Sequence, residues 1–217
     1  VLGVVPLRDW DEGFVAQVAR NIWRVWQSGE DTWLYPALNG KPYFNKPPLV
    51  HWGIAALYQF FGVNEWTSRL PGALCGAMSV PLLYGLGRQV FRVRSPAVLS
   101  ALVYLTWFPL VRHGRLAMLD MALTLFWMAA WFCVVRSRRD WRWSLALGLA
   151  LGTLSMTKGI VALLLLILAV AFLAWDTPRL LRLPLFWLGI LLGWLPAIAW
   201  YGLQFDHYGM AFIDQNL

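Results

Sequence analysis

The chain has 217 residues, of which 59% are hydrophobic and only 13% are charged. These proportions exclude an ordinary soluble domain and predict a polytopic membrane protein. The net charge of +7 does not indicate nucleic-acid binding, because most of the arginines cluster in short connections between apolar runs, where they report membrane topology.

The first part of the chain, residues 1–68, contains no run that could span a membrane. Residues 13–27 have an apolar and a polar helical face, which predicts a helix lying along the membrane surface. A turn signal follows at 39–42. Residues 49–61 are apolar but too short to cross comfortably, which favours a second interfacial helix. We therefore expect residues 1–68 to be an extracytoplasmic first loop with interfacial helices.

The second part, residues 69–217, is predicted to be a transmembrane helix bundle. The expected fold class is therefore all-α, a polytopic membrane bundle with extracytoplasmic interfacial helices. Both ends of the chain read as cut, and residues 1–6 resemble the end of a preceding helix. The apolar runs that predict the bundle number six: 69–91, 96–112, 116–135, 143–157, 160–175 and 184–203.

The arginine-rich connections predict the topology. Three connections are rich in arginine, and basic loops are retained on the cytoplasmic side. The remaining loops alternate with these three and must therefore lie on the outer side. Residues 1–68, Asp120 and Lys158 then converge on the outer face. We expect a multi-pass protein of the cytoplasmic (inner) membrane with its active site facing the periplasm or exterior. The connections assigned to the cytoplasm are 88–95, 136–142 and 176–183.

The consecutive carboxylates Asp11 and Glu12 precede the first interfacial helix. Two interpretations stay open at this point. The carboxylates could stabilise the helix N-terminus, or one could accept a proton from an acceptor hydroxyl while the other orients a partner group. The two roles are compatible, since a capped helix is a rigid mount.

Five further residues are candidates for substrate binding, each with a plainer explanation beside it. Asp120 lies inside an apolar run, where a carboxylate costs on the order of 2.5–3.5 kcal/mol at full depth, or it pairs with a nearby arginine. Lys46 and Tyr43, in a stiff proline-containing loop, could hold a phosphate, or Lys46 is an ordinary exposed lysine. Lys158 is either functional or a snorkelling lysine. Arg69 either binds substrate or anchors a helix at the headgroups.

Metal and nucleophile chemistry find no support in the sequence. The three histidines, His51, His113 and His207, have no ligand spacing between them. No Ser-His-Asp or Cys-His arrangement is evident either. We therefore expect neither a metal site nor a cofactor.

Together these motifs resemble the GT-C glycosyltransferases, in the bacterial branch related to protein O-mannosyltransferases and to the aminoarabinose transferase that modifies lipid A. The resemblance covers nearly the whole chain, and the motifs occur in the order that the family uses. They are Asp11-Glu12-Gly13-Phe14, Val18-Ala19-Arg20-Asn21-Ile22, Gly40-Lys41-Pro42-Tyr43-Phe44-Asn45-Lys46-Pro47-Pro48-Leu49, Ser68-Arg69-Leu70-Pro71, Leu119-Asp120 and Met156-Thr157-Lys158-Gly159.

The resemblance implies an inverting transfer of a sugar from a polyprenyl-phosphate carrier to a lipid, glycan or protein acceptor at the outer membrane face. Such an enzyme serves the cell envelope, in lipopolysaccharide or protein glycosylation. The implied partners are the donor, the acceptor and membrane lipids, and not nucleic acid. Some relatives have an acidic residue where this chain has Asn45, so a metal ligand at that position is absent.

The same resemblance assigns residue roles. Asp11 would be the catalytic base and Glu12 its acceptor-positioning neighbour. Lys46 and Tyr43 would hold the donor phosphate, and Asp120 would line the acceptor cavity. Substrate-binding roles carry over less directly to two basic residues, Arg69 and Lys158.

Two other classes of function stay open. A transporter or flippase for a lipid-linked anion would line a path with arginine and lysine, and should place charged positions near the bilayer midplane. A non-catalytic scaffold would leave the Asp-Glu pair and Asp120 unexplained. The clustering of charged candidates at one face favours the glycosyltransferase.

Overall fold

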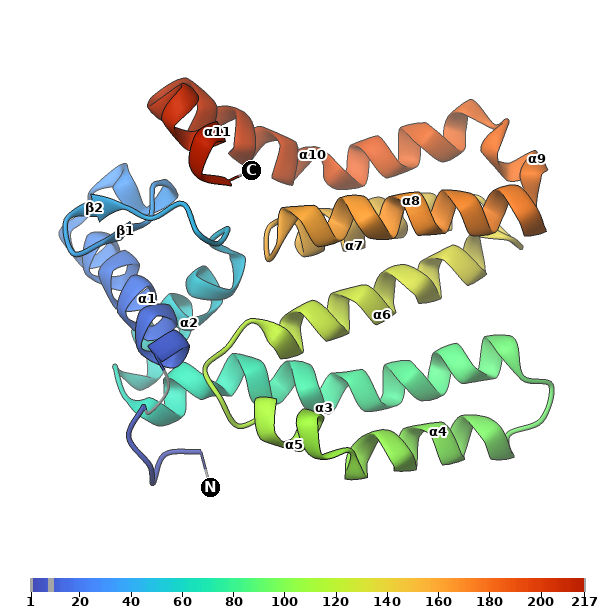
Figure 1. The fold of residues 1–217 in the computed structure, drawn as a ribbon, viewed down its shortest axis with the longest axis horizontal. Helices are drawn as coiled ribbons and strands as arrows, with labels where there is room; N and C mark the ends of the chain where they lie inside the picture. The colour runs from blue at the N-terminus through green and yellow to red at the C-terminus, as the bar shows by residue number, and fades with distance from the viewer. Residues whose placement is uncertain (1, 8–9, 217) are drawn as a thin grey trace.

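The computed structural model describes residues 2–7 and 10–216 and is a helical bundle with a small structured segment at one end (Figure 1). The end segment contains α1 (Trp10–Ser28), η1 (Asp31–Leu34), β1 (Ala37–Leu38), β2 (Lys41–Pro42) and α2 (Leu49–Phe61). The bundle contains α3 (Glu65–Val90), α4 (Ser95–Thr106), α5 (Phe108–His113), α6 (Asp120–Ser137), α7 (Trp143–Ser155), α8 (Gly159–Asp176), α9 (Pro178–Leu181), α10 (Pro184–Tyr208) and α11 (Met210–Asn216).

Helices α1 and α2 pack against each other through their apolar faces. Val15 and Ala19 of α1 cluster with Ile54 of α2, and all three are fully or almost fully buried. The exposed side of α1 carries polar residues such as Arg20 and Arg24. The helices expected at 13–27 and 49–61 are thus confirmed, and their amphipathic pattern explains why the two lie together.

The turn signal between these helices forms a two-residue hairpin that joins β1 to β2. Asn39 and Gly40 both adopt positive φ, 52° and 76°, which two-residue hairpin turns require. Just before the hairpin, the carbonyl of Leu34 accepts hydrogen bonds from Trp200 Nε1 at 3.1 Å and Gln204 Nε2 at 2.9 Å. These bonds fasten the end segment to α10 of the bundle.

Helices α3, α6, α8 and α10 are each long and apolar enough to cross a membrane. The shorter apolar helices α4 and α7 have 12 and 13 residues. Along α8 the exposed positions are themselves apolar, for example Ile160 and Ile167, while Leu165 and Leu173 on the other side are buried. An apolar face without a protein partner suits contact with lipid, so the bundle is that of a multi-pass membrane protein.

Two of the expected spans differ from the structure. The run 96–112 is not one helix. Helix α4 ends at Thr106, and α5 begins after Trp107 with Pro109 in its first turn, where proline has no N–H to continue the earlier helix. The run 116–135 becomes helical only from Asp120, since residues 114–119 form a turn that crosses α3.

The motifs Gly148-x-x-x-Gly152 and Gly189-x-x-x-Gly193 pack α7 directly against α10. A Cβ at Gly148 would clash with the backbone of Ile190, and one at Gly193 would clash with the backbone of α7. A Cβ at Gly152 would lie 3.2 Å from the Gly193 carbonyl oxygen. The small residues of the two motifs therefore allow the two helices to approach closely.

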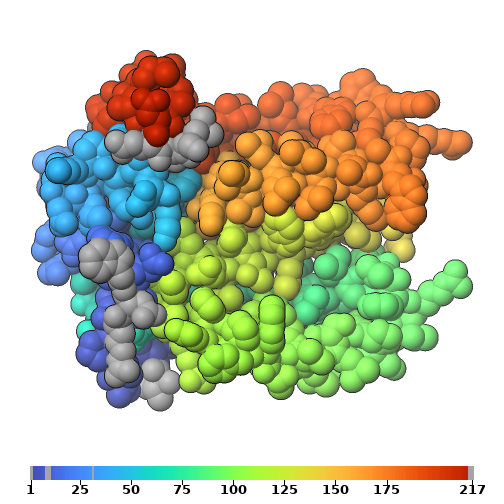
Figure 2. Space-filling view, viewed as in Figure 1, coloured from blue at the N-terminus to red at the C-terminus, as the bar shows by residue number. Residues whose placement is uncertain are grey.

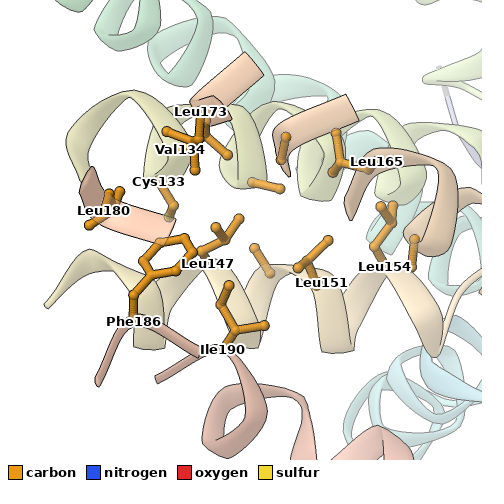
Figure 3. Packing of buried hydrophobic residues seen from close by; sticks show 14 residues of the cluster. Cys133, Val134, Leu147, Leu151, Leu154, Leu165, Leu173, Leu180, Phe186 and Ile190 are labelled. Atoms are coloured by element: carbon orange, nitrogen blue, oxygen red, sulfur yellow. The ribbon is translucent and has the colours of Figure 1, made fainter. Parts of the chain in front are cut away.

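The largest buried apolar cluster lies between α6, α7, α8 and α10 (Figure 3). Leu147 and Leu151 of α7 occupy its centre, with Phe186 of α10 on one side and Val134 of α6 and Leu165 of α8 on the other. All five side chains are at most 1% exposed. This cluster fixes the helices whose ends carry the candidate site.

The two ends of the bundle differ in character. The connections between α3 and α4, α6 and α7, and α8 and α10 all lie at one end, opposite the segment with α1 and α2 (Figure 1). The end segment and α11 share the other end (Figure 2). Residues 2–7 contain no helix, contrary to the expectation for 1–6, because Arg69 holds several of their carbonyl groups in an irregular path.

Candidate active site

The two neighbouring carboxylates of α1 have opposite environments. Both lie in the first turn, where negative charge is favourable to the helix dipole. The side chain of Asp11 is 54% exposed, whereas that of Glu12 is fully buried. Glu12 lies one helical turn before the buried residues Val15 and Ala16, so it shares their inward face.

Glu12 forms a buried ion pair with Arg69 of α3. Arg69 Nε donates to Glu12 Oε1 at 2.9 Å and Arg69 Nη2 donates to Glu12 Oε2 at 3.0 Å. The guanidinium also donates to the carbonyls of Leu2, Val5 and Pro6 at 2.7, 2.7 and 3.1 Å. Such a bidentate, fully hydrogen-bonded pair holds both side chains in one geometry.

The same carboxylate anchors the turn before α6. The Ala117 N–H donates to Glu12 Oε1 at 2.7 Å. On the other side of this turn, a Cβ at Gly72 of α3 would lie 2.9 Å from the Leu116 carbonyl oxygen, so only glycine allows the approach. The contacts to α1 and α3 together fix Asp120, the first residue of α6, beside the start of α1.

Lys46 reaches Asp11 from the loop before α2, with 3.6 Å between Lys46 Nζ and Asp11 Oδ1. This distance fits an ion pair but is too long for a strong hydrogen bond. At the end of the loop, the Leu49 N–H donates to the Met156 carbonyl at 3.2 Å. That bond brings the connection between α7 and α8, which carries Lys158, next to the loop that carries Lys46.

These contacts enclose a cavity of about 440 Å³ that contains two carboxylates and two ammonium groups. The convergence of Asp11, Lys46, Asp120 and Lys158 on one end of the bundle is thus confirmed. The cavity is lined by Asp11, Val15, Asn45, Lys46, His113, Met118, Leu119, Asp120, Leu123, Thr157 and Lys158.

Three polar lining residues were not assigned to the site from the sequence. Asn45 and Thr157 each precede one of the two lysines, so their positions follow from the same loops. His113 ends α5, and its Nδ1 lies 2.7 Å from the Pro109 carbonyl. Only its place just before the turn to α6 could have indicated that it faces the cavity.

Two of the expected binding residues lie outside this cavity lining. Arg69 is enclosed with Glu12. Tyr43 is partly buried, and its ring meets the ring of His51 edge-on with centroids 5.8 Å apart. Burial, and secondly the negative charge of Asp11, raise the pKa of the Tyr43 phenol to about 12. The phenol therefore keeps its proton at neutral pH and remains a hydrogen-bond donor.

A second cavity of about 470 Å³ adjoins the first, and Asn45 and Lys158 line both. Its other walls are mostly apolar and come from α8, α10 and α11, with Trp194 and Phe212 among them. The loops that carry Lys46 and Lys158 thus lie at the boundary between a charged cavity and an apolar one. Within residues 2–7 and 10–216, no group of three or more His, Cys, Asp or Glu side chains forms a candidate metal site.

Residues 45–201 match the family described as dolichyl-phosphate-mannose-protein mannosyltransferase, which is more than half of the chain. The chain belongs to this family. The expected GT-C glycosyltransferase relationship is therefore confirmed, for a multi-pass inner-membrane protein with an all-α fold.

Curated relatives of this mannosyltransferase-family chain include a named group of sugar transferases. An undecaprenyl phosphate-alpha-4-amino-4-deoxy-L-arabinose arabinosyl transferase of Pseudomonas fluorescens is 34% identical over 70% of the chain and 27% of its own length. The transferase of the same name from Edwardsiella ictaluri is 32% identical over 74% of the chain and 29% of its own length. The chain thus spans less than a third of these relatives.

Solved structures share the fold. The crystal structure of ArnT from Cupriavidus metallidurans bound to undecaprenyl phosphate superposes with a TM-score of 0.80, 23% identity and coverage of 99% of this chain and 41% of that one. The apo state of the same protein gives a TM-score of 0.78 at 24% identity, covering 98% of this chain and 41% of that one. At this identity the likeness concerns the architecture.

Proposed function

We propose that the protein transfers a sugar from a polyprenyl-phosphate carrier to an acceptor hydroxyl or amine, with inversion at the anomeric carbon, at the outer face of the membrane. The observation that carries this proposal is the cavity in which Asp11 and Asp120 face Lys46 and Lys158. Carboxylates suit proton acceptance from the acceptor, and lysines suit the departing phosphate.

Asp11 is the catalytic base in this reaction. The acceptor group attacks C1 of the sugar from the side opposite the phosphate, and Asp11 takes its proton. The electron pair of the C1–O bond leaves with the polyprenyl phosphate. Asp11 suits this role because it is the exposed carboxylate of the pair and lines the cavity, on a helix turn fixed by its neighbour Glu12.

Lys46 and Lys158 stabilise the leaving phosphate, and their two ammonium groups balance its growing negative charge. Tyr43 lies outside the cavity lining, and its ring packs on His51 behind the loop that carries Lys46. Lys46 forms an ion pair with Asp11. A bound donor phosphate draws Lys46 away from this pair, so donor binding also frees Asp11 to act as a base.

Glu12 and Arg69 are positioning residues in this scheme. The carboxylate of Glu12 is enclosed, so we propose that it positions the acceptor indirectly, through the residues that it holds. It acts through its bonds to Arg69 and the Ala117 N–H, which set Asp11 on one side and Asp120 on the other. Asp120 lines the same cavity and contacts the acceptor there.

The apolar cavity beside Lys158 suits the first isoprene units of the carrier. A prenyl chain there would extend along α8 and α10, whose outer surfaces are apolar, and its phosphate would lie at the lysine loops. The names of the relatives support an undecaprenyl-phosphate-linked amino sugar as the donor. A lipid, glycan or protein acceptor is compatible with the same chemistry.

The transporter or flippase hypothesis gains no specific support. Transport sites lie near the bilayer midplane, often where helices are broken in corresponding halves. The central parts of α8 and of α10 carry no charged side chain, and the cavity with the candidate residues lies at one end of the bundle.

The test of the proposed function is a transfer assay. The purified full-length protein is incubated with radiolabelled polyprenyl-phosphate sugars and membrane extract, and the product is analysed for anomeric configuration by NMR. We expect labelled product of inverted configuration from one donor class. Retained configuration, or movement of intact donor across proteoliposomes without transfer to any acceptor, would contradict the proposal.

A further inference from the structure

The net charge of the protein is concentrated at the end of the bundle opposite the candidate active site. The three connections at that end and their flanking residues, 88–95, 136–143 and 176–183, contain nine arginines and two aspartates, which gives +7. This equals the net charge of the whole chain, so all other charges sum to zero. The arginine-rich end is therefore built for contact with anions.

A polar cavity of about 240 Å³ lies within this end, between the ends of three membrane-spanning helices. Gln89 comes from α3, Arg138 and Arg139 follow α6, and Asp176 and Thr177 end α8. The cavity shares no lining residue with the catalytic cavity or with the apolar cavity beside it.

Arg138 is fixed in place by the acid beside it. Arg138 Nη2 donates to Asp176 Oδ1 at 2.8 Å, and Nε lies 2.6 Å from Oδ2. Thr177 Oγ1 donates to the same Oδ2 at 2.5 Å, and the guanidinium lies over the Phe172 ring at 5.7 Å. This pair occupies donors on two of the three guanidinium nitrogens, so an oriented edge remains for another acceptor.

The neighbouring arginines, Arg88 and Arg139, form no ion pair with a carboxylate among the residues that the structure describes. Arg139 reaches only the neutral amide of Gln89, at 3.4 Å, among the bonds formed within residues 2–7 and 10–216. The Nη1 atom of Arg88, one residue before Gln89, is buried with no hydrogen-bond acceptor in that part of the chain. Arg88 is not part of the cavity lining, so the cationic groups that the cavity itself offers to an anion are Arg138 and Arg139.

We propose that this cavity binds the phosphate group of an anionic phospholipid from the leaflet that the arginine-rich end faces. Guanidinium groups match phosphate oxygens geometrically, and basic pockets between membrane helices are suited to phospholipid headgroups. The adjoining surface is apolar, since Val90 of α3 is 62% exposed and Trp175 of α8 is 85% exposed. Acyl chains can therefore pack beside the same helices that hold the phosphate.

The test uses the purified full-length protein in phosphatidylcholine nanodiscs with and without phosphatidylglycerol, and measures retained phosphatidylglycerol by native mass spectrometry. Arg139→Gln should lower the affinity for this lipid about tenfold or more, the usual effect of losing a charge-assisted hydrogen bond. Arg94→Gln is the matched control, because it removes the same charge at the same end from outside the cavity. It should leave retention close to the parent.

Two further measurements complete the test. The melting temperature of Arg139→Gln in pure phosphatidylcholine should match that of the parent, because Arg139 is exposed. A large drop would mean that the variant lost lipid by unfolding, and it would overturn the proposal. Inorganic phosphate should raise the melting temperature of the parent far less than phosphatidylglycerol does. Equal loss of lipid from both variants, or equal protection by free phosphate, would also overturn the proposal.

Discussion

Asp11 and Glu12 are adjacent in sequence, but a helix separates consecutive side chains by about 100°, so the two carboxylates meet different surroundings. We predict that Asp11→Asn keeps expression and melting temperature near the parent while single-turnover sugar transfer falls about 10²–10⁴-fold, the usual worth of a general base. Asparagine keeps the shape of the side chain but cannot take the proton. Turnover within a few-fold of the parent would withdraw the catalytic assignment.

Glu12→Gln serves as the contrasting variant. It removes the negative charge from a buried pair and leaves Arg69 without a counter-charge, which typically costs about 3–5 kcal/mol. The expected result is a large drop in melting temperature, measured on the full-length protein in nanodiscs. A stable Glu12→Gln protein with an altered affinity for acceptor would instead support direct acceptor contact by Glu12.

Lys46 is predicted to contact the donor phosphate. Lys46→Ala should weaken donor binding about 10- to 100-fold, because a charge-assisted hydrogen bond is worth roughly 1.5–3 kcal/mol. The measurement is equilibrium binding of a polyprenyl phosphate to the full-length protein. Lys41→Ala, on the exposed hairpin strand β2, is the matched control and should bind like the parent. Equal affinities of the two variants would return Lys46 to an ordinary surface role.

His51 predicts a specific pH dependence. It is fully buried, and neither ring nitrogen has a hydrogen-bond partner in residues 2–7 and 10–216. Burial, and secondly the charge of Lys46, lower the pKa of His51 to about 4, while the Pro47 carbonyl opposes this shift without reaching hydrogen-bonding geometry. The unfolded chain, with a pKa near 6.5, binds this proton more readily than the folded one.

The free energy of unfolding is therefore unaffected by His51 above about pH 6.5. It falls by about 3 kcal/mol as the pH drops from 6.5 to 4 and below. We expect the melting temperature of the full-length protein to fall over this window. His51→Phe keeps a ring beside Tyr43 and removes the titration, so it should flatten the dependence. An identical acid profile in parent and variant would contradict this account.

At the scale of elements, the glycine faces of α7 and α10 predict a matched pair of substitutions. Gly148→Ala places a methyl group against the Ile190 backbone, and such overpacking costs about 1–3 kcal/mol. Gly202→Ala is the matched substitution on α10. The added methyl group meets no atom within 4 Å, so stability should stay unchanged or rise by up to about 1 kcal/mol from helix propensity. Thermal unfolding of both variants tests this prediction, and equal melting temperatures of Gly148→Ala and Gly202→Ala would refute it.

Most elements were predictable from sequence periodicity, and their ends were not. The interfacial helices follow from local amphipathicity, and α2 occupies the residues expected, 49–61. The break at Trp107 comes from Pro109, a local cause, whereas the break before Asp120 comes from tertiary contacts. A six-residue turn fits between α1 and α3 only because Glu12 accepts its Ala117 N–H and Gly72 leaves room. No local pattern encodes contacts between residues a hundred positions apart.

The charged core of the site was predictable for a global reason. Alternation of basic loops brings the ends of every second connection to one face, which is enough to group Asp11, Lys46, Asp120 and Lys158. The burial of Glu12 was not predictable, because adjacent carboxylates look equivalent in a sequence. Only the packing of α1 on its neighbours decides which of the two faces the cavity.

At the scale of the whole molecule, the separation of charge predicts which end stays in the cytoplasm. In a background with Cys75 and Cys133 replaced by alanine, Glu30→Cys and Lys158→Cys should react with an impermeant thiol reagent added to intact cells. Arg92→Cys should react only after permeabilisation, because basic loops remain inside. Labelling of position 30 from the cytoplasmic side would overturn the outward-facing site.

The equal numbers of carboxylates and ammonium groups in the catalytic cavity have a consequence for turnover. A sugar phosphodiester brings one negative charge, and the phosphate left after transfer carries about two near neutral pH. The proton captured by Asp11 offsets the added charge while it stays in the cavity. Once that proton escapes to water, the carrier phosphate faces a restored carboxylate and is repelled. For the proposed reaction we therefore predict that loss of a proton times the release of the spent carrier, and that solvent deuterium slows this release.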